Sequence, residues 1–192
     1  MTRVNVRNLP RHLTVLILLA GTALAVTPAG AEARSAAPVR PLVGGVFNPI
    51  RNVGDGKCLQ PEGESMAEFA AIVQMPCATT GLAGLAQGWQ QIRVGTNHYR
   101  FVNQLSGFCF DAFDGAFNGA RLLQGTCVPI SNEEFNTNTG LPNVVALESR
   151  VGFRNTGYCI DVPGALPFDG MAMQIYRCNG TLAQRWVVGF AG

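Results

Sequence analysis

The chain has 192 residues, of which only 14% are charged, against roughly a quarter in an average soluble domain. With the three arginines and one glutamate of the first 33 residues set aside, eleven of the 14 basic and eleven of the 12 acidic residues remain, so the rest of the chain has a formal charge of zero. A neutral surface does not attract phosphate backbones or anionic lipid, which argues against a nucleic-acid partner and suits neutral polar ligands.

The N-terminal segment is typical of a secretory signal peptide. Three arginines precede an uncharged apolar run of 14 residues (13–26), and small residues follow it. The run is shorter than the roughly 20 residues of a membrane-spanning helix, and no other run of that length follows. We therefore expect a signal peptide over residues 1–33, a flexible tether over 34–45 and one secreted domain over 46–192, with no membrane span.

The six cysteines recur with a fixed period. The first, third and fifth lie in the similar segments GKCLQ (56–60), GFCFD (107–111) and GYCID (157–161), and these cysteines are 51 and 50 residues apart. Each is followed by another cysteine after 18 or 19 residues. Six cysteines allow fifteen pairings, but the symmetry of the repeat predicts one disulfide within each unit. The predicted pairs are Cys58–Cys77, Cys109–Cys127 and Cys159–Cys178.

A polar–x–aromatic step follows each cysteine pair. The three steps are QGW (87–89), EEF (133–135) and QRW (184–186). One unit of about 50 residues buries too little apolar surface to fold alone, so the three units are expected to close around a common axis. Their shared core would have Trp89, Phe135 and Trp186 at its centre.

The secondary structure is predicted to consist of strands and turns. Twenty-three glycines and eleven prolines interrupt the chain too often for long helices. The β-rich runs are HYRFVN (98–103), NVVALES (143–149), AMQIYRC (172–178) and RWVVGF (185–190). In SMAEFAAIVQM (65–75) the apolar residues also fit helical spacing, but the register of the repeat favours a strand there. The fold class is therefore all-β.

These repeated segments resemble the ricin-B-type lectin β-trefoil, which also occurs as a carbohydrate-binding module attached to secreted glycosidases. The resemblance rests on the three C-x-[DQ] segments and the Q-x-W-like steps, and it covers about residues 46–190. It implies a β-trefoil with three pseudo-symmetric repeats and up to three shallow sugar pockets.

The resemblance also implies which residues would hold a sugar. Family members place a carboxylate two residues after the first cysteine of a unit and an aromatic residue two before the second. A carboxylate can accept hydrogen bonds from neighbouring hydroxyls, and an aromatic ring can stack on the apolar face of the sugar. In the third unit these two residues are Asp161 and Tyr176.

Amide side chains complete the implied site in the third unit. Gln174 lies two residues before the aromatic residue, and Gln184 matches the glutamine of the Q-x-W step. The asparagine that usually precedes this glutamine is Ala183 here, and Asn179 is the expected substitute. Amides can both donate to and accept from sugar hydroxyls.

The other two units keep less of this pattern. The second unit has Asp111 and Asn132, which are weaker candidates because Gly125 stands at the aromatic position. The first unit has Gln60 in place of the carboxylate and Met75 in place of the aromatic residue, so it is expected not to bind sugar.

Several of these residues have a structural alternative. Asp161 and Asp111 could instead bond the backbone of the turn that follows each of them. Tyr176 could be a half-buried strand residue, and Gln184 could hold the backbone of the repeat without touching a ligand.

The sequence gives no indication of catalysis. His98 is the one histidine after the predicted signal peptide, and the chain has no HExxH helix, phosphate loop or nucleotide-binding glycine pattern. Paired cysteines leave no thiol nucleophile and no thiolate metal site. The carboxylate pairs Asp161/Asp169 and Asp111/Asp114 lie in glycine-rich turns, where solvated loops are expected. We expect no enzyme, no cofactor and no metal.

Two functions from different classes fit the sequence. The first is a secreted sugar-binding protein for galactose- or xylose-type glycans, such as galactosides or plant polysaccharides, with its main site in the third unit. The second is a degenerate trefoil whose loops bind a protein partner, as in a protease inhibitor or a subunit of a secreted complex. The incomplete first and second units and the longer loop at 78–88 favour this alternative.

Overall fold

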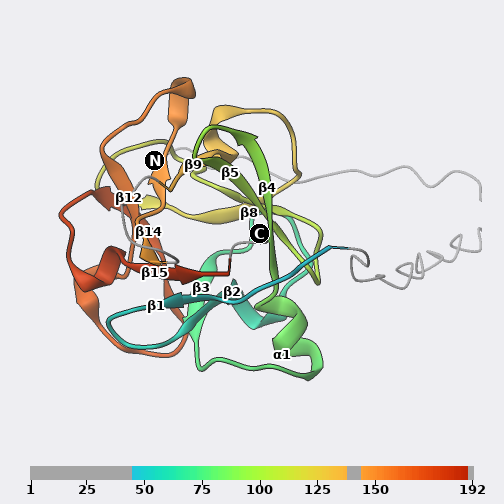
Figure 1. Ribbon diagram of the computed structural model, residues 1–192. Coiled ribbons are helices and arrows are strands. Elements are labelled where there is room, and N and C mark those ends of the chain that lie inside the picture. Colours follow the sequence, from blue (N-terminus) through green and yellow to red (C-terminus); the bar gives the residue numbers. More distant parts are fainter. Residues whose placement is uncertain (1–44, 138–143, 190–192) are drawn as a thin grey trace, which may run out of the picture. The chain divides into compact units, whose positions relative to one another are not determined.

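Short strands dominate the structure, a computed structural model that describes residues 45–137 and 144–189 (Figure 1). The predicted signal peptide and all but the last residue of the predicted tether lie outside the described residues. Within the described ranges, no helix is long and apolar enough to cross a bilayer. The prediction of an all-β fold is confirmed.

The strands fall into three lobes, one for each repeat. The first lobe contains β1 (Ile50–Asn52), β2 (Cys58–Pro61), β3 (Ile72–Met75) and β4 (Trp89–Gly95). The second contains β5 (His98–Asn103), β6 (Cys109–Asp111), β7 (Ala120–Arg121), β8 (Leu123–Gly125) and β9 (Phe135–Asn136). The third contains β10 (Val144–Val145), β11 (Glu148–Ser149), β12 (Tyr158–Asp161), β13 (Met171–Ala172), β14 (Gln174–Arg177) and β15 (Trp186–Val188).

Short helical turns lie between the strands. The 3-10 turns are η1 (Glu62–Glu64), η2 (Ser131–Glu133), η3 (Val151–Phe153), η4 (Pro163–Ala165) and η5 (Leu182–Gln184). The α-helix α1 (Gly81–Ala86) lies in the longer loop of the first lobe, where the sequence analysis expected no helix. Its leucine and alanine residues favour a helix, and Thr80, in extended conformation, precedes it.

The three lobes join through strand pairing. In the six-stranded sheet β15 lies between β10 and β1, so the last described strand pairs with the first. Ile50 is opposite Val188 in this antiparallel pair. Figure 1 shows the result, with the red β15 running beside the blue-green β1. The third lobe is thereby held against the turn that follows β1.

The same hairpin register recurs in each lobe. The first cysteine of each unit is opposite the residue two before the second cysteine: Cys58 opposite Met75, Cys109 opposite Gly125 and Cys159 opposite Tyr176. This register brings the two cysteines of each unit together. The disulfides are Cys58–Cys77, Cys109–Cys127 and Cys159–Cys178, as predicted. Each closes a loop of about 20 residues, worth about 3 kcal/mol in the chain-entropy model.

Aromatic side chains fill the shared core. Trp89, Phe135 and Trp186 are fully buried, which confirms the prediction for all three. The indole N–H of Trp89 donates to the carbonyl of Leu59 (2.8 Å), and that of Trp186 donates to the carbonyl of Ile160 (3.1 Å). Each tryptophan thus ties its lobe to the residue that directly follows the first cysteine.

Two of the predicted strands differ in detail from the structure. In segment 65–75 the last four residues form a strand, β3, where the repeat register predicted one. Phe69 has a φ of 66°, in the left-handed region, so a continuous helix through this segment is excluded. The run 143–149 contains two short strands, β10 and β11, rather than one.

Candidate functional site

Each repeat has a buried polar side chain at the same position, next to its second cysteine in space. These are Gln87, Glu133 and Gln184, the first residues of the three polar–x–aromatic steps. Each accepts a hydrogen bond from the backbone N–H directly after the second cysteine: Ala78 (2.7 Å), Val128 (2.9 Å) and Asn179 (2.8 Å). This shared geometry explains why a glutamine or glutamate recurs there.

In the first and third lobes, the other end of this side chain donates to the residue two after the first cysteine. Gln87 Nε2 donates to Gln60 Oε1 (2.8 Å) in the first lobe, and Gln184 Nε2 donates to Asp161 Oδ1 (3.0 Å) in the third. Gln184 also donates to the carbonyl of Arg177 and does not line the cavity beside Asp161. The contacts of Gln184 match the structural alternative, because its side chain bonds the backbone and orients Asp161.

Asp161 stands at the end of β12 and is only 4% exposed. Its Oδ1 accepts from Gln184, and its Oδ2 accepts from Gln174 Nε2 (2.8 Å) on β14. Burial raises the pKa of the Asp161 carboxyl, while these two amide hydrogen bonds lower it. Since each carboxylate oxygen can accept about two hydrogen bonds, Asp161 keeps capacity for further donors.

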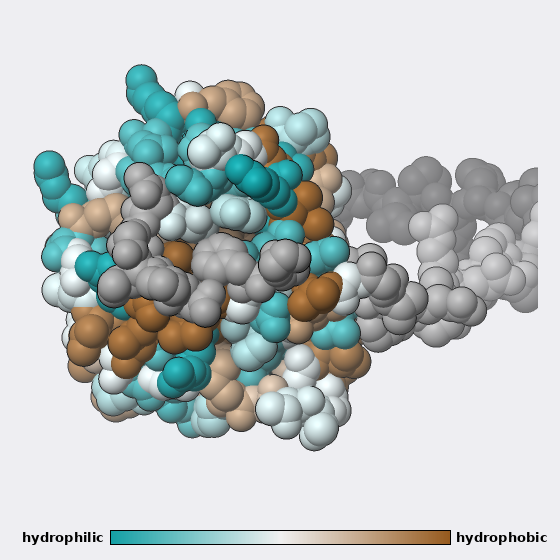
Figure 2. Space-filling model, viewed as in Figure 1, coloured by the Kyte–Doolittle hydropathy of each residue, from teal (hydrophilic) through white to brown (hydrophobic). Residues whose placement is uncertain are grey.

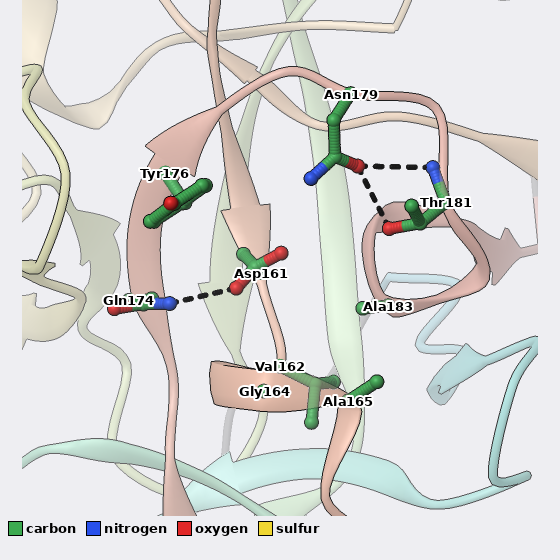
Figure 3. A pocket seen from close by; sticks show the side chains of 9 residues that line it. All are labelled: Asp161, Val162, Gly164, Ala165, Gln174, Tyr176, Asn179, Thr181 and Ala183. Carbon is green, nitrogen blue, oxygen red and sulfur yellow. Dashed lines mark hydrogen bonds between the residues drawn. The ribbon is translucent and has the colours of Figure 1, made fainter.

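A cavity of about 350 Å³ opens over this carboxylate. It is lined by Asp161, Val162, Gly164, Ala165, Gln174, Tyr176, Asn179, Thr181 and Ala183. In Figure 3, Gln174 and Tyr176 project from one strand, Asn179 and Thr181 lie on the opposite side, and Asp161 lies between them. The structure thus brings together four of the residues predicted for the third unit.

Tyr176 and Asn179 give this cavity one aromatic and one amide wall. Tyr176 is 37% exposed, so part of its ring is open to a ligand although it stands on strand β14. Asn179 Oδ1 accepts from the N–H (3.0 Å) and the hydroxyl (2.7 Å) of Thr181. Its oxygen is therefore occupied, and its amide nitrogen faces the Asp161 side in Figure 3. Ala183 adds only a methyl group.

The second lobe lacks this combination. Asp111 is buried at the matching position, and burial raises the pKa of its carboxyl. Gly125 replaces the aromatic residue, and a Cβ added there would lie 3.1 Å from Asp111 Oδ2, so the carboxylate lies close to this strand. Asn132 is half-buried beside Ser131. The structure therefore has no aromatic wall at the Gly125 position.

The first lobe is closed by its own amides. Gln60 is buried, accepts from Gln87 and donates to Glu64 Oε1 (3.2 Å). Met75 takes the place of the aromatic residue. Gln60 carries no charge, so its amide makes weaker hydrogen bonds to sugar hydroxyls than a carboxylate does.

The remaining carboxylates of the suggested catalytic pairs are held in ion pairs. Asp169 pairs with Lys57, and Asp114 pairs with Arg121 at 2.8 Å. The hydrogen bond from Arg121 lowers the pKa of Asp114 to about 2. A group held ionised in this way is poorly suited to act as a general acid. Among the described residues, no cluster of three or more potential metal ligands occurs.

A family model for the ricin-type β-trefoil lectin-like domain matches residues 42–125. Over these residues the chain is similar to the ricin-type β-trefoil lectin-like domain, and its described fold is a β-trefoil. The match spans the first lobe and most of the second, and the third lobe repeats the same hairpin register and disulfide. The predicted resemblance is confirmed.

Solved structures with the same trefoil fold include lectins and a module of an enzyme. A designed threefold-symmetric protein, ThreeFoil, matches with a TM-score of 0.65 and 22% identity, over 73% of this chain and 95% of that one. An exo-β-1,3-galactanase from Clostridium thermocellum matches with 0.66 and 25%, over 76% of this chain but only 30% of that one. The C-half of the earthworm R-type lectin in complex with GalNAc matches with 0.57 and 18%, over 73% and 95%. A search of curated proteins found no match.

Proposed function

We propose that this domain is a secreted carbohydrate-binding module whose main site is the third-lobe cavity. The observation that carries the proposal is the pairing of a buried carboxylate, Asp161, with a partly exposed aromatic ring, Tyr176, across one cavity. The carboxylate accepts hydrogen bonds from sugar hydroxyls while the ring stacks on the C–H face. Gln174 and Asn179 supply amide groups on opposite sides.

Galactose- or xylose-type glycans are the proposed ligands. Two proteins of the same fold favour galactosides: one is the exo-β-1,3-galactanase, and the other is the earthworm lectin in complex with GalNAc. A single shallow site binds weakly, so multivalent glycans would raise the overall avidity. The three disulfides agree with export to an oxidising compartment.

The proposal assigns binding rather than catalysis to the domain. Asp161 is engaged by two glutamines, and the nearby Asp169 pairs with Lys57. Glycoside hydrolysis requires a pair of carboxyl groups at the site, and Asp161 is the one carboxylate among the residues that line its cavity. The galactanase of the same fold is a much longer chain, of which this domain spans 30%.

The substitution Asp161→Asn tests the site. A ligand at 100 times its Kd stabilises the folded state by about 2.7 kcal/mol, so concentrated galactose, lactose or xylan oligomers are expected to raise the melting temperature. Asp161→Asn should abolish this rise, because it removes the charge that accepts from sugar hydroxyls. Thermal unfolding with and without sugar measures the effect.

The matched control is Asp111→Asn, since Asp111 has the same register in the second lobe but no aromatic wall. It should leave the sugar-dependent rise intact. An equal loss of the rise in both variants, or a full rise in Asp161→Asn, would contradict the assignment to the third lobe.

A protein partner is the alternative function, and an exposed apolar cluster favours it. Phe69 and Phe113 pack edge to face at 5.2 Å between ring centroids on the surface, and Phe117 is also exposed. If no member of a broad glycan panel raises the melting temperature, the alternative becomes the better account. Its own test is whether Phe113→Ser disrupts binding to a co-purifying secreted protein.

A further inference from the structure

A second cavity of about 370 Å³ lies beside the proposed sugar site. It is lined by Asn52, Gly54, Asp55, Val162, Ala165, Pro167, Leu182 and Ala183. Val162, Ala165 and Ala183 line both cavities, so the two spaces meet over these three residues. The second cavity reaches from the third lobe to the turn that follows β1 in the first lobe.

The residues between the two cavities have small side chains, so they obstruct the passage little. Ala183 and Ala165 each contribute only a methyl group, and Val162 is buried. Among the nine side chains drawn in Figure 3, none extends between Ala183 and Ala165. Alanine at 183, in place of the usual asparagine, therefore gives the first cavity one hydrogen-bonding group fewer. It also leaves the space between the two cavities unfilled.

The walls of this groove are held in place by buried amides. Asn52 Nδ2 donates to the carbonyls of Leu182 (3.1 Å) and Ala183 (3.4 Å), which fixes the η5 side. Gln74 Nε2 donates to the carbonyls of Leu166 (2.9 Å) and Phe168 (3.1 Å), which fixes the opposite loop. A groove whose walls are already ordered loses little conformational entropy when a ligand binds.

The chemistry of the second cavity also suits a sugar ring. Leu182 is 60% exposed and Pro167 is exposed, so both offer apolar surface to a C–H face. Figure 2 shows hydrophobic surface low on the left of the visible face, over the region of the third-lobe loops and the β1–β2 turn in Figure 1. Asp55 Oδ1 accepts from the Lys57 N–H (3.0 Å), whereas its Oδ2 is buried and has no hydrogen-bond partner. Asp55 thus adds a carboxylate to the lining of this cavity, beside the apolar surface.

We propose that the second cavity holds a second sugar ring, so that the domain recognises a disaccharide unit of a linear glycan rather than one terminal sugar. The proposal rests on the proposed function, since the first ring occupies the cavity over Asp161. The second ring crosses Ala183 and packs against Leu182 and Pro167. Each cavity lies within the range of about 300–1,000 Å³ that is usual for ligand pockets.

Calorimetric titration with matched sugars tests this inference. The probes are methyl β-galactoside against β-1,3-galactobiose, and methyl β-xyloside against xylobiose. For the class that binds, the disaccharide is expected to bind about tenfold more tightly than the methyl glycoside, which corresponds to 1.4 kcal/mol. Leu182→Ser should remove most of this ratio and leave the affinity for the methyl glycoside unchanged.

Two further variants make the test specific. Leu82→Ser is the matched control, because Leu82 is 56% exposed but lies on α1, outside the groove, and it should preserve the ratio. Ala183→Asn places a longer side chain at the passage and should lower the ratio by weakening disaccharide binding.

The outcomes separate the two proposals. If the methyl glycoside binds in an Asp161-dependent manner but the disaccharide binds no more tightly, the second ring has no site and only the proposed function stands. A ratio that survives both Leu182→Ser and Ala183→Asn also overturns the inference. If none of the four sugars binds, the proposed function fails, and the inference fails with it.

Discussion

Replacing Glu133 with glutamine is expected to stabilise the domain above pH 7 and to remove much of the pH dependence of its unfolding. Burial raises the pKa of Glu133 from its ordinary 4.5 to about 7. The N–H of Val128 and the charge of Arg100 lower this pKa, and the charge of Asp111 raises it. Burial outweighs the hydrogen bond and the ion pair, so the native side chain is mainly protonated below about pH 7.

The direction of the pH dependence follows from this shift. Between about pH 4.5 and pH 7 the native state binds more protons at Glu133 than the unfolded chain does, so the free energy of unfolding falls as the pH rises. The full shift corresponds to about 3 kcal/mol. Asp111 acts in the same direction, because burial and the charge of Glu68 raise its pKa. Asp114, with its lowered pKa, acts in the opposite direction but only below about pH 4.

Glutamine fits position 133 because the other two lobes already use it there. Gln87 and Gln184 each accept from a backbone N–H and donate to the residue two after the first cysteine of the unit, which is Gln60 or Asp161. In the second lobe, Glu133 Oε1 and Asp111 Oδ1 are both buried without a hydrogen-bond partner. A glutamine at 133 would always have an N–H to donate to Asp111, whereas Glu133 can donate only when it is protonated.

Urea denaturation from pH 5 to pH 8 measures this effect in the wild type and in Glu133→Gln. The neighbouring buried residue provides the control. Glu134→Gln should lower stability at every pH, because Arg150 loses its charged partner at 2.6 Å and Arg100 loses one of two carboxylates, the other being Glu133. A Glu133→Gln variant that is less stable than the wild type at pH 8 would contradict this interpretation of the second lobe.

Replacing Trp186 with alanine is expected to cost about 3–5 kcal/mol of unfolding free energy. Trp186 is fully buried, and its strand pairs with both neighbours, opposite Asn52 on β1 and Val145 on β10. The substitution leaves a cavity at the point where the first and third lobes meet. It also leaves the carbonyl of Ile160 without the indole donor.

Trp186→Phe separates the cavity from the lost hydrogen bond. Phe135 occupies the equivalent position in the second lobe and is fully buried, so a phenyl ring fits this core. The phenylalanine variant should therefore cost less, about 1–3 kcal/mol for the unsatisfied carbonyl and the smaller ring. Urea denaturation of the three proteins gives the order of stability, and equal losses in both variants would argue against Trp186 as a central core residue.

The period of the sequence was sufficient to predict the disulfides, the core aromatics and most strands. Each repeat places its cysteines and its polar–x–aromatic step at the same distance, so one register accounts for all three lobes. The helix α1 escaped prediction because it lies in a loop that the other two lobes do not share.

The site could be predicted only in part. The family resemblance implied Asp161, Gln174 and Tyr176, with Asn179 as a substitute, and the structure places all four around one cavity. The position of Gln184 behind Asp161 could have been inferred from its equivalence to Gln87, since a residue kept in a degenerate lobe indicates a structural role.

Two other features depend on tertiary contacts that no single segment contains. The second cavity forms where the turn at 54–55 of the first lobe meets the loops of the third. The raised pKa of Glu133 depends on its burial. The sequence shows only that a glutamate stands where the other two repeats have a glutamine, and this does not reveal the burial.

Chemical-shift mapping on ¹⁵N-labelled protein tests the central claim most directly. A glycan array selects the sugar, which is then titrated into the protein. The amides of Asp161, Tyr176 and Asn179 are expected to show the largest shifts, while those of Asp111 and Gly125 in the second lobe stay in place. Shifts that gather in the first or second lobe, or no shifts with any arrayed glycan, would contradict a sugar site in the third lobe.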